Sequence, residues 1–265
     1  MKKITYFLIC VLSLSLSCTK EDVSSNDNSS GNGNGNGSID TSANQQATGT
    51  SANALLSDTE FNQLIIELAY VEGFSPSNAA VENLIAFLTE RTFKPNGISV
   101  VTQVIPSQEN IELTVNDIIA IEDNYRTQYN SEGTIAVWAF FTNGSSANNT
   151  ENGVVLGTAY RNTSFVIFEE TIHGLSDGTF EPNRSVLEST VILHEIGHLL
   201  GLTNLGTALQ SDHEDQDHPK HCNVETCLMY FSAETGSGIE NLIGANSAPE
   251  LDAQCIADLQ ANGGK

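Results

Sequence analysis

The clearest chemistry in the sequence is the pattern HExxH, formed by His194, Glu195 and His198. Histidines four residues apart share one helix face, where both imidazoles can bind a single Zn²⁺ at about 2.0 Å. Glu195 points about 100° around the same helix, towards a metal-bound water and away from the metal. The alternative is a core helix with two hydrogen-bonded histidines and a surface glutamate, but such groups are unfavourable to bury without a use. The pattern therefore predicts a zinc site in which Glu195 acts as a base.

A catalytic zinc needs a third protein ligand and leaves its fourth position to water. The pattern extends to HExxHxxG, and the position three residues after its glycine is Asn204, whose neutral amide is a poor zinc ligand. Further along come a histidine and a cysteine, four residues, a second cysteine, one residue and a methionine: His221, Cys222, Cys227 and Met229. Together these motifs resemble the archaemetzincin signature of the metzincin clan of zinc endopeptidases, with an insertion before His221.

The resemblance implies a fold, a ligand set and a reaction. The fold would be a metzincin-like α/β catalytic domain: a mixed, mostly parallel sheet with an edge strand over the cleft, a zinc helix, a Met-turn and a C-terminal helix. His221 would be the third ligand, and Met229 would lie under the metal without binding it. The substrate would be a polypeptide, attacked by a zinc-activated water whose proton Glu195 accepts and passes on. Residues 157–164, which run into residues 165–168, would supply the edge strand, on which the peptide lies as an added strand; the alternative is an ordinary edge hairpin.

The insertion before His221 offers rival ligands. It contains His213 and His218, and we rank His221 first, His213 second and His218 last, because His221 adjoins Cys222 in the signature. The four carboxylates of residues 212–217 could also hold Ca²⁺, which prefers oxygen ligands, or could form a solvated acidic surface.

The cysteines form a second set of residues that could pair or bind a metal. In an oxidising compartment Cys222 and Cys227 could form a disulfide, which would leave Cys255 free. The archaemetzincin resemblance implies instead a second, structural zinc, bound by Cys222, Cys227 and a later pair that is Asp252 and Cys255 in this chain. Both alternatives remain open at this stage.

Two other functions fit parts of the sequence. A gluzincin-type metallopeptidase would take its third ligand from a later helix, as Glu234 or Glu240. A non-catalytic surface lipoprotein could bind partners on a peptidase scaffold, but the intact Glu195 argues against it, because only catalysis needs a carboxylate there. His173 and Tyr230 receive no role from the sequence.

The N-terminus resembles that of an exported lipoprotein. Residues 1–17 combine two lysines with a short apolar run, as in a lipoprotein signal peptide, and Cys18 would become the acylated first residue of the mature chain. Residues 18–52, rich in Asn, Gly and Ser, predict a flexible linker, and residues 53–265 predict one zinc metallopeptidase domain. The sequence Lys20-Glu21-Asp22 resembles a surface-sorting tag. We therefore expect lipid on Cys18 to hold the protein at the outer membrane, on the cell surface or otherwise facing the periplasm.

Composition limits the partners. The chain has 33 acidic and 10 basic residues and a net charge of −23, which disfavours nucleic acids and anionic lipid surfaces. Its apolar content of 39% is sufficient for a packed domain.

Periodicity predicts alternating strands and helices. Residues 64–71, 98–105 and 134–141 read as buried strands, and residues 154–160 and 164–168 as shorter ones. One helix ends before the sequence Pro95-Asn96-Gly97, a second opens at Thr114, and the zinc helix opens with a capping box from Ser185 to Glu188. This alternation indicates an α/β layer with a mostly parallel sheet.

Overall fold

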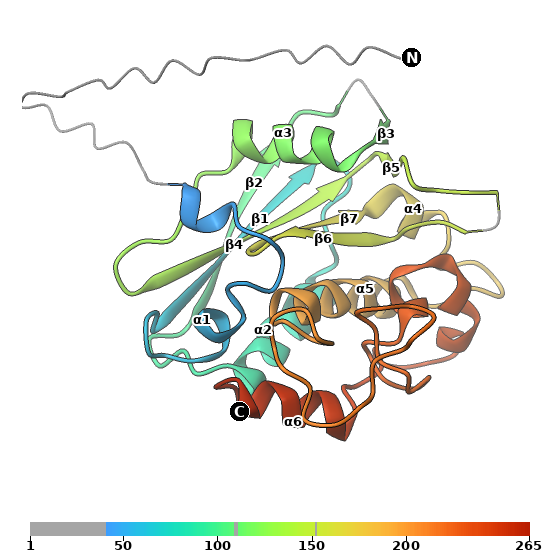
Figure 1. Ribbon diagram of the computed structural model, residues 1–265. Helices are drawn as coiled ribbons and strands as arrows, with labels where there is room; N and C mark the ends of the chain where they lie inside the picture. The colour runs from blue at the N-terminus through green and yellow to red at the C-terminus, as the bar shows by residue number, and fades with distance from the viewer. Residues whose placement is uncertain (1–40, 109–110, 152) are drawn as a thin grey trace, which may run out of the picture. The chain divides into compact units, whose positions relative to one another are not determined.

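A five-stranded sheet carries the fold. The computed structural model describes residues 41–108, 111–151 and 153–265 (Figure 1). The strands are β1 (Gln63–Val71), β2 (Ile98–Ile105), β4 (Thr134–Thr142), β6 (Gly157–Arg161) and β7 (Ser164–Phe168), in the order β2-β1-β4-β7-β6. β6 is antiparallel to β7, and the other neighbouring pairs of this sheet are parallel. The prediction of a mixed, mostly parallel α/β sheet is thus confirmed.

Helices cover both faces of the sheet, which explains why β4 is almost wholly apolar. α3 (Val115–Tyr125) covers one face, and α2 (Asn78–Arg91) and α5 (Arg184–Leu199) cover the other (Figure 1). Successive residues of β4 point to opposite faces, so Trp138 packs in the core cluster that includes Ile118 of α3, whereas Val137 packs in the cluster that includes Val191 of α5. The sheet therefore supplies a rigid platform against which α5 is fixed.

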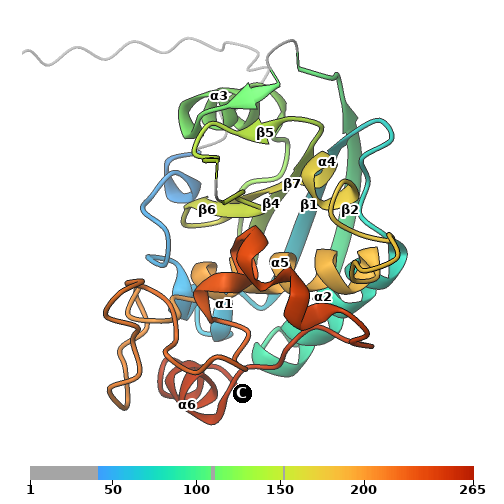
Figure 2. The same ribbon diagram turned by 90° about the vertical axis from the view of Figure 1, so that its right-hand side faces the viewer.

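Shorter elements connect these or follow them: η1 (Ser42–Asn44), α1 (Ala52–Leu56), β3 (Glu112–Leu113), β5 (Ser145–Ser146), α4 (Glu169–His173), η2 (Phe231–Glu234), η3 (Gly236–Leu242) and α6 (Ala253–Ala261). The chain after α5, including the C-terminal helix α6, lies on the α5 side of the sheet in both views (Figures 1 and 2). Within the described ranges, no helix is both long and apolar enough to cross a bilayer.

The start of α5 differs from the prediction, and the expected capping box from Ser185 to Glu188 is wrong. The N-cap is Asn183, whose side chain accepts a hydrogen bond from the Ser185 amide at 3.0 Å. Glu188 is fully buried and accepts a hydrogen bond from the Ser77 amide instead. By contrast, the helix start predicted at Thr114 is confirmed, and Thr114 and Asp117 form a full capping box there at the start of α3.

The folded unit starts earlier than residue 53, which corrects the predicted linker boundary. Asn44 is 0% exposed, and its side chain donates hydrogen bonds to the Ala136 carbonyl at 3.2 Å and to Thr163 Oγ1 at 3.0 Å. Composition could not reveal this, because a polar amide finds its partners only when the sheet has formed. The predicted signal peptide, Cys18 and the linker up to residue 40 lie outside the described residues.

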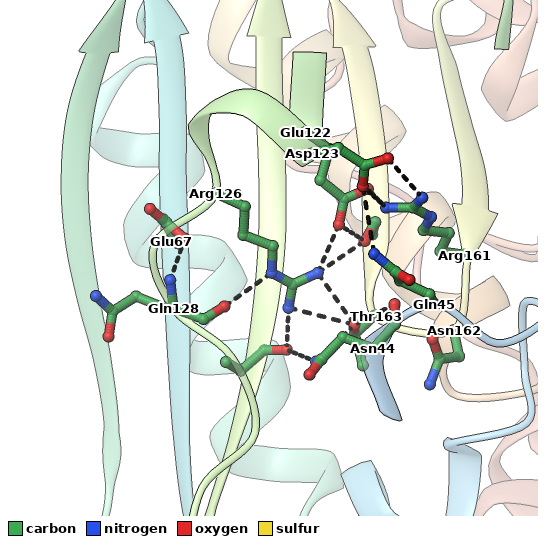
Figure 3. Close-up of polar contacts among 12 residues, drawn as sticks. Asn44, Gln45, Glu67, Glu122, Asp123, Arg126, Gln128, Arg161, Asn162 and Thr163 are labelled. Carbon is green, nitrogen blue, oxygen red and sulfur yellow. Dashed lines mark hydrogen bonds and ion pairs between the residues drawn. The ribbon is translucent and has the colours of Figure 1, made fainter. Parts of the chain in front are cut away.

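A buried ionic network lies at the C-terminal end of α3 (Figure 3). Arg126 forms an ion pair with Glu122 at 2.7 Å, and both side chains are at most 1% exposed. Its remaining N–H groups donate to carbonyl and hydroxyl oxygens, including the carbonyls of Gln128 and Ala136 at 2.8 Å each. The second oxygen of Glu122 pairs with Arg161 at 3.1 Å. Every charge in this network therefore has a partner within the chain.

Candidate metal centre

The C-terminal half of α5 positions three of the predicted site residues. His194, Glu195 and His198 are 0%, 0% and 6% exposed. The helix ends at Leu199, and Gly201 then adopts a φ of +80°, a left-handed conformation that glycine tolerates and that turns the chain out of the helix.

His221 joins these two histidines from the far side of the insertion. Its ring centroid lies 5.2 Å from those of both His194 and His198, which are 4.7 Å apart. The loop is held in place next to the ring, because the Thr203 hydroxyl donates to the Lys220 carbonyl at 2.8 Å. The three imidazoles of the first-ranked ligand set thus lie together.

The rival histidines lie elsewhere. His213 is fully buried in a separate cluster of cysteines. His218 is largely exposed, contacts Asp215 at 2.9 Å and stacks on Phe231 with a centroid distance of 3.6 Å. Asn204 is exposed, and its side-chain amide donates to a carboxylate of the insertion.

Glu234, the alternative ligand of the gluzincin hypothesis, also reaches this place. Its carboxylate oxygens lie 3.3 Å from His221 Nε2, 3.8 Å from His194 Nε2 and 3.9 Å from His198 Nε2. One donor atom from each of the four side chains lies within 4.8 Å of the others. Glu240 is exposed and belongs to none of the metal-capable groups found among the described residues.

His194 and His198 are in the protonation state that a metal requires. His194 Nδ1 lies 2.8 Å from the Leu228 carbonyl, to which it must donate, so the lone pair of Nε2 faces the cluster. That Nε2 is buried without a hydrogen-bond partner, and so are both ring nitrogens of His221. Burial and the neighbouring rings lower the pKa of His194 and of His198 to about 3. Both rings are therefore neutral near pH 7 and can act as ligands.

Glu195 is buried with both carboxylate oxygens unpartnered. A Cβ atom at Gly157, the first residue of β6, would stand 2.7 Å from Glu195 Oε1, so only glycine lets this edge strand approach α5 so closely. Burial, and then the nearby charge of Glu234, raise the pKa of Glu195 well above its usual value. Burial also opposes the ionisation of Glu234, but the His221 and His194 rings outweigh it and lower the pKa of that carboxyl. Glu195 and Glu234, two carboxyl groups close enough to influence each other, thus have opposite pKa shifts.

Met229 lies under α5. It is 0% exposed, and its sulfur contacts the face of the helix that Gly197 leaves open. The Met229 carbonyl accepts a hydrogen bond from the Cys222 amide at 2.8 Å, which ties the chain after the insertion to this turn.

A second metal-capable group consists of His213, Cys222, Asp252 and Cys255, whose donor atoms lie within 4.8 Å of one another. Cys227 adjoins it, with its Sγ 3.7 Å from the Cys255 Sγ. These three thiols are free in the structure, so neither a Cys222–Cys227 disulfide nor any other bridge joins them.

Of these three thiols, that of Cys227 loses its proton most easily. Hydrogen bonds from Cys222 and Cys255, supported by the amides of Asp252 and Met229, lower the pKa of Cys227 to about 4. The bond that Cys222 donates to Cys227 raises the pKa of Cys222 to about 12. A thiolate surrounded by buried donors is the state in which cysteine binds a soft cation.

No family model matches the sequence, and no curated protein matches it. Among solved structures, the chain is similar to a crystal structure of an archaemetzincin from Methanopyrus kandleri, with a TM-score of 0.49 and 17% identity over 76% of this chain and 96% of the other. What the site can do therefore follows from its own side chains.

Sequence reasoning missed Asp258 and misplaced His213. Asp258, on α6, is fully buried and lies 2.8 Å from His213 Nε2, which turns Nδ1 towards Cys222 at 3.5 Å. A carboxylate at a buried position of an otherwise apolar helix stripe was the available signal. The acidic insertion adds no other side chain to the metal-capable groups of the described residues, and Glu214 instead accepts a hydrogen bond from the Lys220 amide.

Proposed function

We propose that the chain is a zinc-dependent endopeptidase whose metal is held by His194, His198 and His221. The observation that carries this proposal is a set of buried polar atoms on the histidine cluster and the adjacent Glu195: Nε2 of His194 and both Glu195 oxygens have no hydrogen-bond partner, and Nε2 of His221 faces only the Glu234 carboxylate, at 3.3 Å. Buried polar atoms in native proteins normally have partners, so such a concentration indicates an external one.

The donor set fits zinc. Neutral imidazoles are good Zn²⁺ ligands, and distances of 3.3–3.9 Å between the Glu234 oxygens and the ring nitrogens are compatible with ligands of one ion. When bound, Zn²⁺ would polarise the scissile carbonyl and lower the pKa of a water molecule.

Glu195 supplies the proton chemistry in this proposal. Its carboxylate accepts a proton from the attacking water and delivers it to the leaving amine. In the metal-free chain burial favours the protonated carboxyl, whereas the positive charge of a bound Zn²⁺ would favour the carboxylate that the first step needs. Burial then helps the group to keep the proton until the second step. Gly157 places the edge of β6 beside this carboxylate, where an extended peptide can add main-chain hydrogen bonds.

Glu234 bears on a second candidate function. Its backbone pairs with the chain before β6, since the Leu156 amide donates to the Glu234 carbonyl at 2.9 Å and the Gly236 amide to the Val154 carbonyl at 3.0 Å. As a fourth ligand, its carboxylate would close the coordination sphere, as in structural zinc sites. The position of the Glu234 carboxylate beside the three histidines therefore fits two possibilities. One is a resting peptidase from which substrate displaces Glu234, and the other is a non-catalytic metal site on a surface lipoprotein.

The wider assignment has three further parts. A second, structural cation would be bound by His213, Cys222 and Cys255, with Cys227 or Asp252 as the fourth donor. The substrate would be a polypeptide. Export as an outer-membrane lipoprotein through Cys18, on the cell surface or facing the periplasm, rests on the sequence of residues 1–22 alone.

The test compares Glu195→Gln with Glu240→Gln, which removes an exposed charge outside the metal-capable groups of the described residues. We expect wild type and Glu240→Gln to cleave a peptide library in a chelator-sensitive reaction. Glu195→Gln should keep its zinc but lose about 10³-fold or more in kcat/KM, because the general base is gone. Equal turnover in wild type and Glu195→Gln would refute the mechanism.

A second arm separates the two roles of Glu234. In the peptidase, Glu234→Gln should retain zinc on three histidines and raise kcat/KM by a few-fold, because a weaker fourth ligand is more easily displaced. In the non-catalytic site, the same variant should lose zinc affinity, and no variant should cleave any peptide of the library.

A further inference from the structure

Two buried glutamates and a histidine meet where α4 packs against the first turns of α5, apart from both groups described above. Glu169 and His173 are the first and last residues of α4, and Glu188 lies on α5. One donor atom from each lies within 4.8 Å of the others. We propose that Glu169, His173 and Glu188 bind a first-row divalent cation, for which Zn²⁺ is the probe.

The strongest evidence is the carboxylate of Glu169. Its side chain is 0% exposed, and neither oxygen has a hydrogen-bond partner. Glu188 is also fully buried; its Oε2 accepts the Ser77 amide at 3.0 Å, but its Oε1 has no hydrogen-bond partner. Two carboxyl groups in contact away from water cannot both be ionised unless a positive charge lies between them.

His173 lies with its Nε2 next to Glu169. Arg184 Nη1 lies 3.2 Å from this nitrogen, and because a guanidinium can only donate, Nε2 carries the lone pair and accepts from Arg184 in the metal-free chain. Nε2 has a single lone pair, so a bound cation would take the place of this partly exposed guanidinium. The same Nε2 is 3.2 Å from Glu169 Oε1, which nevertheless has no hydrogen-bond partner. Two acceptors at this separation match neighbouring ligands of one ion, since bonds of about 2.0 Å at tetrahedral angles place ligand atoms about 3.3 Å apart. Stacking on Phe74, with centroids 5.5 Å apart, holds the ring in this orientation.

The two carboxylates carry more negative charge than the nearby positive side chain can neutralise. Arg184 is the nearest positive group, with its Nε 3.4 Å from Glu188 Oε1 and a side chain that is 39% exposed. One partly exposed guanidinium can neutralise one of the two carboxylates. An imidazole together with two carboxylates is a mixed nitrogen and oxygen set, which suits Zn²⁺ and its first-row neighbours better than Ca²⁺.

A shared proton is the competing explanation. Burial and the neighbouring Glu188 raise the pKa of Glu169 to about 10 in the absence of a cation, so the pair could hold one proton instead of a metal. Glu169→Gln distinguishes the two, because an amide reproduces the shape and donor capacity of the protonated acid but is a poor ligand.

The experiment counts metal ions per chain. The full chain and its variants are dialysed against Zn²⁺ and analysed by mass spectrometry of the metal. Glu170→Gln is the matched control, since it removes a charge from an exposed neighbour on the same helix. We expect wild type and Glu170→Gln to bind one more ion than Glu169→Gln, with the histidine and cysteine groups intact in all three.

A second variant secures the test against misfolding. His173→Gln removes the one nitrogen ligand from a side chain that is 27% exposed, and it should lose the same ion. Chelator-sensitive peptide cleavage should persist in both variants, so this result does not depend on the proposed catalysis. Equal zinc content in wild type and in either folded variant would overturn the proposal.

Discussion

Two buried polar clusters in this molecule differ in whether their polar atoms find hydrogen-bond partners within the chain. In the network at the end of α3, Glu122 and Arg126 are at most 1% exposed, and every N–H of Arg126 has an acceptor in the chain (Figure 3). His194 and Glu195 are just as completely buried, but Nε2 of His194 and both carboxylate oxygens of Glu195 have no hydrogen-bond partner.

The difference teaches how to distinguish structure from function in a buried polar cluster. A buried charge that the chain itself neutralises fixes the packing and leaves nothing to bind. A buried cluster with unpartnered donors and acceptors is unfavourable for the chain alone and becomes favourable when a ligand supplies the missing partner. The metal-capable groups at His194, His213 and Glu169 should therefore respond to metal, whereas the Arg126 network should not.

The cysteine group offers the largest expected effect, because binding of a structural zinc contributes on the order of 10 kcal/mol. Cys222, Cys227 and Cys255 should react with a thiol reagent only after chelation. His213→Ala should expose them without chelator, whereas His218→Ala, in the same insertion, should behave as wild type. Thiols that stay hidden until reduction would indicate a disulfide and contradict the second cation.

The Arg126 network should show the opposite behaviour. Glu122→Gln leaves Arg126 buried without its counter-charge, which should reduce the free energy of unfolding by about 3–5 kcal/mol. Asp123→Asn is the control, because that side chain is 44% exposed and forms a surface ion pair with Arg161 and a long hydrogen bond with Gln45, so its effect should be below about 1 kcal/mol. Denaturant unfolding and zinc analysis check both variants. A loss of bound zinc in folded Glu122→Gln would break the distinction between the two kinds of cluster.

The sequence predicted the parts of the fold and site that local pattern encodes. The apolar runs that became β1, β2 and β4 and the pair His194 and His198 follow from periodicity and spacing. Long-range placement was less accessible. His221 could be ranked only by a resemblance, since an insertion separates it from α5, and the association of His213 with Asp258 depends on how two distant segments pack.

Local pattern also misled in one place. The sequence from Ser185 to Glu188 has the form of a capping box, but Glu188 belongs to a buried group with Glu169 and His173. Tertiary contacts between α4 and α5 outweighed the local signal, because a buried carboxylate must be satisfied wherever its partners are. A glutamate that departs from its local role is thus a useful indicator of a site.

The smallest expected effect concerns pH in the chelated protein, and it tests the comparison at Glu195. Burial raises the pKa of this carboxyl in the folded chain, so above about pH 4.5 the unfolded chain binds fewer protons and stability should fall as pH rises. One such group contributes at most about 1.4 kcal/mol per pH unit. Glu169 contributes with the same sign, so the informative quantity is the difference between wild type and Glu195→Gln.

Urea unfolding between about pH 5 and pH 8 should give a flatter profile of unfolding free energy against pH for Glu195→Gln, and Glu240→Gln should follow wild type. Identical slopes for Glu195→Gln and wild type would mean that Glu195 has a partner in the metal-free chain after all, and the contrast with Glu122 would then no longer hold.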